Sequence, residues 1–288
     1  MQIGVVFPQT EIGEDPEQVA RFATTAEAVG YRHLLAYDHV IGANTASRPD
    51  WTGPYTSKSL FHEPFVLFGF LAGLTQRIGF ATGVLILPQR QTALVAKQAA
   101  SLDVLCSGRL RLGIGTGWNP VEYEVLEQNF RDRGKRSEEQ IEVLRRLWAE
   151  GEVEYDGRWH RIPDAGINPL PPNRRIPIWI GGFAPLIAER VGRLADGWLP
   201  MDHPGLPADI QRMRQTAKDH GRDPDSIGIE CIIPPSATHE SARDHLRRLE
   251  DAGVSHVSVS MMNIGIQGAQ AHIDTLQGYW DAVGDLSD

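Results

Sequence analysis

The chain has 288 residues, which is long enough to bury a large core and too long for a small disulfide-stapled module. Its 41% hydrophobic and 23% charged residues exclude a largely disordered chain. The net charge of −9, with no visible cluster of basic residues, disfavours binding to phosphate backbones or anionic membrane surfaces. We therefore expect neither a nucleic acid nor a membrane as a partner.

The N-terminus, the apolar runs and the cysteines carry the signals for the cellular compartment. The N-terminal MQIGVVFPQ has no basic segment and too short an apolar run for a signal peptide. The longest apolar stretch, Pro64–Leu74, is well short of the roughly 18 residues that span a bilayer. Cys106 and Cys231 have no CxxC partner, which predicts two reduced, buried thiols. Together these features predict a cytoplasmic protein.

Short β-branched runs alternate with longer amphipathic segments along the chain. The pattern predicts strands, in chain order, at Ile3–Phe7, His33–Tyr37, Ile78–Val84, Leu110–Gly115, Ile176–Ile180, Gly197–Pro200, Ile227–Ile233 and His256–Met261. It predicts helices at Pro16–Val29, Glu63–Leu74, Thr92–Leu105, Arg136–Trp148, Pro185–Ala195, Ala208–His220, Glu240–Ala252 and Ala269–Val283. Because Glu63–Leu74 is apolar on nearly all sides, we expect it to be well buried. A small hairpin is expected over Val153–Ile162, turning at Asp156-Gly157.

Eight strand–helix units of about 36 residues each indicate parallel strands. A doubly wound sheet would usually show GxGxxG after its first strand, but Pro8-Gln9-Thr10 stands there. The glycines of Gly113–Gly117 do not complete that motif, since Trp118 occupies the third glycine position. We therefore predict one α/β domain over residues 1–288, a (β/α)8 TIM barrel. Its long insertions are Val40–His62 after strand 2 and Asp156–Arg175 before strand 5.

The carboxyl ends of the strands, where barrel enzymes place their chemistry, carry few titratable groups. No HxH or HExxH motif supports a metal-dependent hydrolase, so we expect no metal site. Schiff-base chemistry is disfavoured because none of the four lysines falls on a strand end. Asp38 and Asp202 are the only candidate carboxylates for a glycosidase pair. The remaining glycine-rich, apolar ends are typical of a site for a flat aromatic cofactor.

Three features at these ends have both a functional and a structural interpretation. His39 follows strand 2; its imidazole either transfers protons near neutral pH or only satisfies local hydrogen bonds. Asp38 either orients His39 or caps the following loop. Gly181-Gly182-Phe183 opens a helix and marks either an anion site at the helix N-terminus or a tight turn.

Several motifs in the right order resemble the luciferase-like flavin and deazaflavin oxidoreductases, and most closely their mycobacterial-type branch that uses coenzyme F420. The motifs are AYDHV, TGVLILPQRQTALVAKQAASLDVLCSGRLRLGIGTGW, FRDRGKRSEE, PIWIGG and ADGWLP. The resemblance implies a (β/α)8 barrel and, as the catalytic residue, a strand-2 histidine that faces the deazaflavin and exchanges a proton, here His39. It implies a bulge in strand 3, often a cis peptide bond, against which the ring leans. The remaining implied cofactor residues flank that bulge, end strand 4 and form the phosphate-binding turn: Thr82, Gly83, Val84, Thr116, Gly117, Gly181, Gly182 and Phe183.

One departure from the family bears on the substrate. Deazaflavin-dependent sugar-phosphate dehydrogenases of the family have a catalytic glutamate where this chain has Trp118, and an aromatic residue where it has Ile41-Gly42-Ala43. The departure argues against a sugar phosphate and favours an apolar or aromatic small molecule beside Trp118.

The resemblance leaves three functions open. The first is hydride transfer between F420 and a small substrate, with His39 moving the coupled proton. The second is an FMN-dependent monooxygenase, and the third a non-catalytic cofactor carrier or sensor. The resemblance further implies a homodimer, through the helices at Glu63–Leu74 and Thr92–Leu105. A basic groove for the acidic tail of F420 is expected from four arginines, Arg48, Arg90, Arg174 and Arg175.

Overall fold

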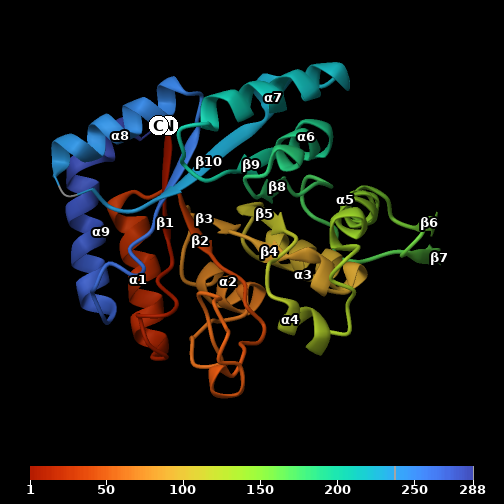
Figure 1. The fold of residues 1–288 in the computed structure, drawn as a ribbon, viewed down its shortest axis with the longest axis horizontal. Coiled ribbons are helices and arrows are strands. Elements are labelled where there is room, and N and C mark those ends of the chain that lie inside the picture. The colour runs from red at the N-terminus through yellow and green to blue at the C-terminus, as the bar shows by residue number, and fades with distance from the viewer. Residues whose placement is uncertain (237, 288) are drawn as a thin grey trace.

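The computed structural model describes residues 1–236 and 238–287, and within them parallel strands close into a barrel surrounded by helices (Figure 1). The barrel strands are β1 (Gln2–Val6), β2 (His33–Ala36), β3 (Gly79–Thr82) continued by β4 (Leu85–Ile86), β5 (Leu110–Gly115), β8 (Ile178–Gly181), β9 (Gly197–Leu199), β10 (Gly228–Ile233) and β11 (His256–Val259). Neighbours pair in the order β3-β2-β1-β11-β10-β9-β8-β5, and pairing of β3 with β5 closes the ring. The predicted (β/α)8 barrel is confirmed.

Helices cover the outside of the barrel (Figure 1). They are α1 (Pro16–Val29), α2 (Pro64–Ala72), α3 (Thr92–Leu105), α4 (Pro120–Val125), α5 (Arg133–Ala149), α6 (Pro185–Leu194), α7 (Leu206–Asp219), α8 (His239–Asp251) and α9 (Ala269–Val283). Within the described residues, short 3-10 turns lie between helices at Thr45–Ser47, Leu87–Gln89 and Pro224–Ser226, and another follows α9 at Gly284–Leu286. Helix α1 illustrates the local cause: Asp15 accepts a hydrogen bond from the Glu17 amide, Pro16 starts the helix, and Gly30 ends it at φ 125°. None of the helices in the described part of the chain combines the length and apolarity needed to cross a bilayer.

The hairpin outside the barrel turns later than predicted. Its strands are β6 (Val153–Asp156) and β7 (Arg161–Ala165), so the turn lies at residues 157–160. The Glu139 carboxylate explains the shift, since it accepts hydrogen bonds from three successive turn amides, those of Arg158, Trp159 and His160, at 2.8–3.0 Å. This tertiary contact replaces the two-residue turn that Asp156-Gly157 would favour.

The expectation that the apolar helix α2 is well buried all round is wrong. Leu67, Phe68 and Leu71 pack into the core, but Val66 is 70% exposed and Phe70 44% exposed. The barrel covers only one side of the helix, and no other part of the described chain covers the other side. Helix α3 next to it also exposes apolar side chains, including Leu94 and Leu105.

A buried polar cluster fills the amino-terminal half of the barrel interior. Glu230 lies 2.6 Å from His33 Nε2, accepts a hydrogen bond from Ser258 and pairs with Arg111. Burial by itself would raise the pKa of Glu230, but Arg111 and His33 outweigh it and hold that pKa far below its ordinary value. Because the charges are paired in place, this end of the barrel is a packed core, and the opposite end is left for a ligand.

Candidate functional site

A cavity of about 860 Å³ opens at the carboxyl ends of the barrel strands. All but one of the residues predicted for the site border it: Asp38, His39, Gly83, Val84, Thr116, Gly117, Trp118, Gly181, Gly182 and Phe183. The volume lies within the range of cofactor and small-molecule sites. The structure therefore brings together, in one cavity, the strand ends that the sequence placed far apart.

Thr82 is the exception, since it does not border the cavity. Its side chain is fully buried and donates a hydrogen bond of 2.6 Å to the Gly113 carbonyl. This bond joins β3 to β5 below the cavity floor. Successive strand residues point to opposite faces, so Thr82 and the adjacent Gly83 face different sides of the strand.

The cavity floor forms where the third barrel strand is interrupted. The Gly83–Val84 peptide bond is cis, as the resemblance implied. Val84 projects between two glycines: an added Cβ would come within 2.4 Å of a Val84 methyl at Gly115 and within 2.5 Å at Gly181. Gly83 has no room for a side chain either, because a Cβ there would meet Leu35 at 2.3 Å. The result is a smooth apolar floor that a planar ring system can contact closely.

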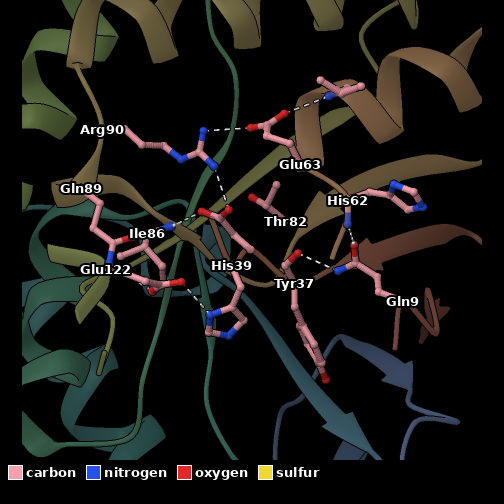
Figure 2. Close-up of polar contacts among 12 residues, drawn as sticks. Gln9, Tyr37, His39, His62, Glu63, Thr82, Ile86, Gln89, Arg90 and Glu122 are labelled. Atoms are coloured by element: carbon pink, nitrogen blue, oxygen red, sulfur yellow. Dashed lines mark hydrogen bonds and ion pairs between the residues drawn. The ribbon is translucent and has the colours of Figure 1, made fainter. Parts of the chain in front are cut away.

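His39 borders this cavity. Figure 2 shows its imidazole turned toward Glu122. Its Nδ1 lies 3.0 Å from Glu122 Oε1. Its Nε2 has no hydrogen-bond partner among the described residues and is not buried. Aromatic rings hold the imidazole in place, with Tyr55 and Phe61 at centroid distances of 4.7 and 4.8 Å. His39 thus uses one ring nitrogen in a contact with Glu122 and leaves the other without a protein partner among the described residues.

Glu122 is the functional candidate that the sequence analysis missed. It lies on α4, a helix that was not predicted, and is 1% exposed. Its second oxygen accepts a hydrogen bond of 3.2 Å from Gln89 Nε2. The sequence signal for α4 was present: Asn119 accepts a hydrogen bond from the Val121 amide, and Pro120 takes the first helical position.

Asp38 does not orient His39, so that interpretation is wrong. Its carboxylate accepts hydrogen bonds from Arg90 at 2.7 Å and from the Ile86 amide at 2.9 Å (Figure 2). Arg90 in turn binds Glu63 at 2.8 Å. Burial raises the pKa of Asp38 against the opposing effect of Arg90. Asp38 therefore ties the end of β2 to β4 and to the start of α2, a structural role beside the cavity.

The expected basic groove is not assembled from the four predicted arginines. Arg90 is already paired, and Arg174 and Arg175 precede β8, at the opposite end of the barrel. There Arg175 pairs with Asp196. Only Arg48 lies in the loop after β2, where it is exposed.

A different charged group stands at the cavity rim. Asp202 follows β9 and accepts hydrogen bonds of 2.7 Å from His245 Nε2 and from Arg248, both on α8. The Arg248 hydrogen bonds are the main reason that the pKa of Asp202 is lowered. Asp202 and His245 border the cavity on the side formed by β9 and β10.

Helix α6 begins at the cavity edge without a side-chain cap. Gly182 donates its amide hydrogen to the Leu199 carbonyl, so this amide is already used. Within the described chain, the amides of Phe183 and Ala184 have no acceptor. Free amides at a helix N-terminus favour an anion such as a phosphate.

The loop over residues 40–62 closes one side of the cavity. Trp51 and Trp118 approach to a centroid distance of 5.8 Å, and Gly53 lies against Trp118 so closely that a Cβ there would be 2.4 Å from the indole. The loop and the start of α4 lie at the same end of the barrel in Figure 1. The loop therefore contacts Trp118 directly, although the indole stays 41% exposed.

Residues 1–281 match the sequence model of the family described as luciferase-like monooxygenase. The chain belongs to this family. It is 36% identical over 247 residues to an uncharacterised protein of Mycobacterium tuberculosis, covering 82% of each chain. It is 32% identical over 244 residues to an F420-dependent glucose-6-phosphate dehydrogenase of Nocardia farcinica, covering 78% of this chain and 71% of the relative. Among solved structures, an F420-dependent secondary alcohol dehydrogenase superimposes with a TM-score of 0.73, at 17% identity and 98% coverage of both chains, which shows a shared fold.

Proposed function

We propose that this luciferase-like protein is an oxidoreductase that uses coenzyme F420, a deazaflavin, to exchange a hydride with a small apolar or aromatic substrate. The family and the 32% identical dehydrogenase support an oxidoreductase with F420 or a flavin. The observation that carries the proposal is the position of His39, which borders a cavity with a smooth apolar floor and whose Nε2 has no partner among the described residues.

The residues of the cavity fit a deazaflavin. The floor at Val84 is flat because Gly115 and Gly181 carry no side chains, as a planar ring requires. The free amides of Phe183 and Ala184 suit the phosphate that follows the ribityl chain. We expect Gly83, Val84, Thr116 and Gly117 to contact the ring.

When bound, F420 supplies a two-electron hydride acceptor or donor with little reactivity toward oxygen. The protein supplies position and proton transfer. When the substrate is oxidised, His39 Nε2 accepts the proton that the substrate releases. In the reverse reaction His39 returns this proton to the substrate. The loop over residues 40–62 contacts Trp118 and so limits the access of water to one side of the cavity.

The walls around His39 favour a substrate with apolar or aromatic surface. Trp118 and Tyr55 border the cavity beside His39. The sugar-phosphate dehydrogenases that this chain resembles have a catalytic glutamate at the position of Trp118. An indole there contacts rings and alkyl groups and offers no carboxylate to a sugar hydroxyl.

Fluorescence titration of the purified protein with F420 and with FMN, side by side, tests the cofactor. We expect tight binding of F420 and weak binding of FMN. Tight binding of FMN with weak F420 binding, accompanied by oxygen consumption, would instead identify an FMN-dependent monooxygenase. Tight F420 binding without turnover across a broad substrate panel would identify a non-catalytic carrier.

We further propose a homodimer through α2 and α3. The exposed side chains of Val66, Phe70, Leu94 and Leu105 on these neighbouring helices support it. Light scattering coupled to gel filtration is expected to give twice the chain mass for the wild type. Val66→Asp is expected to give the single-chain mass, and a monomeric wild type would contradict the proposal.

A further inference from the structure

We propose that Glu122 is the positioning residue of His39. Its carboxylate holds the imidazole in the tautomer that carries hydrogen on Nδ1, so that the lone pair of Nε2 faces the cavity. The catalytic consequence rests on the proposed function. The tautomer itself does not depend on any cofactor and is measurable without one.

The contact between the His39 and Glu122 side chains has hydrogen-bond length and is largely shielded from solvent. His39 Nδ1 lies 3.0 Å from Glu122 Oε1, and the Glu122 side chain is 2% exposed. A carboxylate has only acceptors, so the shared hydrogen belongs to Nδ1. In a neutral imidazole one nitrogen carries the hydrogen and the other the lone pair, which leaves the lone pair on Nε2.

Glu122 is itself held from two sides. Gln89, buried at 4% exposure, donates from Nε2 to the second carboxylate oxygen at 3.2 Å, while its own Oε1 has no partner. A carboxylate can only accept hydrogen bonds, so Gln89 must turn its NH2 group toward Glu122, as it does here. The adjacent Tyr123 donates a 2.6 Å hydrogen bond to the Thr116 carbonyl and so fixes α4 on the end of β5. The carboxylate therefore has little freedom to leave His39.

No other described group competes for Nδ1. Asp38, the neighbouring carboxylate, is occupied by Arg90 and by the Ile86 amide. Tyr55 and Phe61 contact the ring, but neither is hydrogen-bonded to it. The aromatic contacts restrict where the ring lies, and Glu122 decides which nitrogen carries the hydrogen.

The tautomer determines whether His39 can act as a base toward the cavity. With hydrogen on Nδ1, the Nε2 lone pair can accept the proton that the substrate would release on oxidation, and F420, when bound, would take up the hydride. The resulting imidazolium carries one positive charge, which lies against the Glu122 carboxylate. In the opposite direction the Nε2–H group of the imidazolium returns the proton to the substrate.

Nitrogen-15 NMR of histidine-labelled, cofactor-free protein tests the inference. The His39 signals are assigned by their loss in His39→Asn. In the wild type at a pH where His39 is neutral, we expect the pattern of an Nδ1–H tautomer. In Glu122→Leu, which removes the acceptor, we expect the population of that tautomer to fall and the Nε2–H form to become the major one.

Two further variants distinguish the effect of the acceptor oxygen at position 122 from the effect of its negative charge and from the general effect of changing a buried carboxyl group. Glu122→Gln keeps an acceptor oxygen, and we expect the Nδ1–H tautomer to persist once the Gln89 amide rotates. Asp103→Asn changes another buried carboxyl group, which accepts a hydrogen bond from the Leu110 amide at the start of β5. This variant is expected to leave the His39 signals unchanged. If Glu122→Leu does not fold, the wild-type spectrum alone decides, because an Nε2–H tautomer there overturns the proposal. An unchanged tautomer in folded Glu122→Leu overturns it as well.

A catalytic readout complements the spectra. With F420 and a turned-over substrate, we expect Glu122→Leu to lower kcat about 10- to 100-fold with an unchanged F420 dissociation constant. Failure of F420 to bind the wild type would contradict the proposed function while leaving the tautomer result intact.

Discussion

The side chain of Val84 occupies the space that a side chain at position 181 would need: an added Cβ on Gly181 would lie 2.5 Å from a Val84 methyl. Gly181→Ala must therefore displace Val84 and tilt the cavity floor. We expect the affinity for F420 to fall about tenfold, which corresponds to roughly 1.4 kcal/mol, in a fluorescence titration.

Two variants control this experiment. Gly151→Ala places a Cβ where no atom lies within 4 Å, and should bind F420 like the wild type. Val84→Ala combined with Gly181→Ala removes the clash and should recover part of the affinity. Equal binding by wild type and Gly181→Ala would show that the ring does not rest on this floor.

His39→Asn tests the role of the imidazole. It removes Nε2 from a side chain that borders the cavity but keeps a polar amide at about the position of Nδ1. We expect turnover to fall by roughly 10²- to 10⁴-fold, while the dissociation constant of F420 changes little. Steady-state kinetics beside a binding titration separates the two effects, and undiminished turnover would remove His39 from the mechanism.

The ion pair between Asp38 and Arg90 is expected to stabilise the mouth of the barrel. Arg90→Ala leaves the Asp38 carboxylate, 3% exposed, without its cation. We expect a loss of about 3–5 kcal/mol in the free energy of unfolding by urea. Asp38→Asn with Arg90→Leu removes both charges and should lose less, so an equal loss in the two proteins would contradict the pairing argument.

Acid stability should depend on His256, inside the barrel. Burial lowers its pKa to about 3, with Arg111 and His33 adding to the effect. The unfolded side chain titrates near about 6.5, so between these values only the unfolded chain binds the proton. The free energy of unfolding therefore decreases as the pH falls from about 6.5, by up to about 1.4 kcal/mol per pH unit from this residue.

His256→Gln should flatten this dependence between about pH 6.5 and about pH 5.5, where most carboxyl groups remain ionised in the unfolded chain. His239→Gln changes an exposed histidine on α8 and serves as the matched control. Urea unfolding at several pH values measures both slopes. A slope in His256→Gln equal to that of the wild type would assign the acid sensitivity to other groups.

Much of the fold could be predicted from local signals. The bounds of α1, α3, β5 and α9 agree with the prediction, because caps, glycines and hydrophobic periodicity lie within those segments. The hairpin turn was misplaced because its geometry depends on Glu139, a residue on a different element. Exposure of α2 could not be predicted, since an entirely apolar helix carries no periodic signal for the side that faces the core.

The location of the site could be predicted, but the hydrogen-bond partners of its side chains could not. Strand ends gave most of the cavity residues, because parallel strands bring their carboxyl ends to one edge. Asp38 and His39 are adjacent in sequence, and for that reason their side chains diverge at the strand end. The partner of His39 is Glu122, 83 residues away, and no local pattern reports a contact between two elements so distant in the chain.

The contact between Gly53 and Trp118 links the closing loop to substrate choice. The indole that borders the substrate space also fills the position that a side chain at 53 would occupy. An added Cβ at 53 would also lie 2.7 Å from Trp51, so a larger residue there requires a smaller one at 118 and a shift of Trp51. A carboxylate at 118 would leave the loop without its apolar contact. Acquisition of a new substrate by this scaffold is therefore expected to proceed through paired exchanges at these two positions.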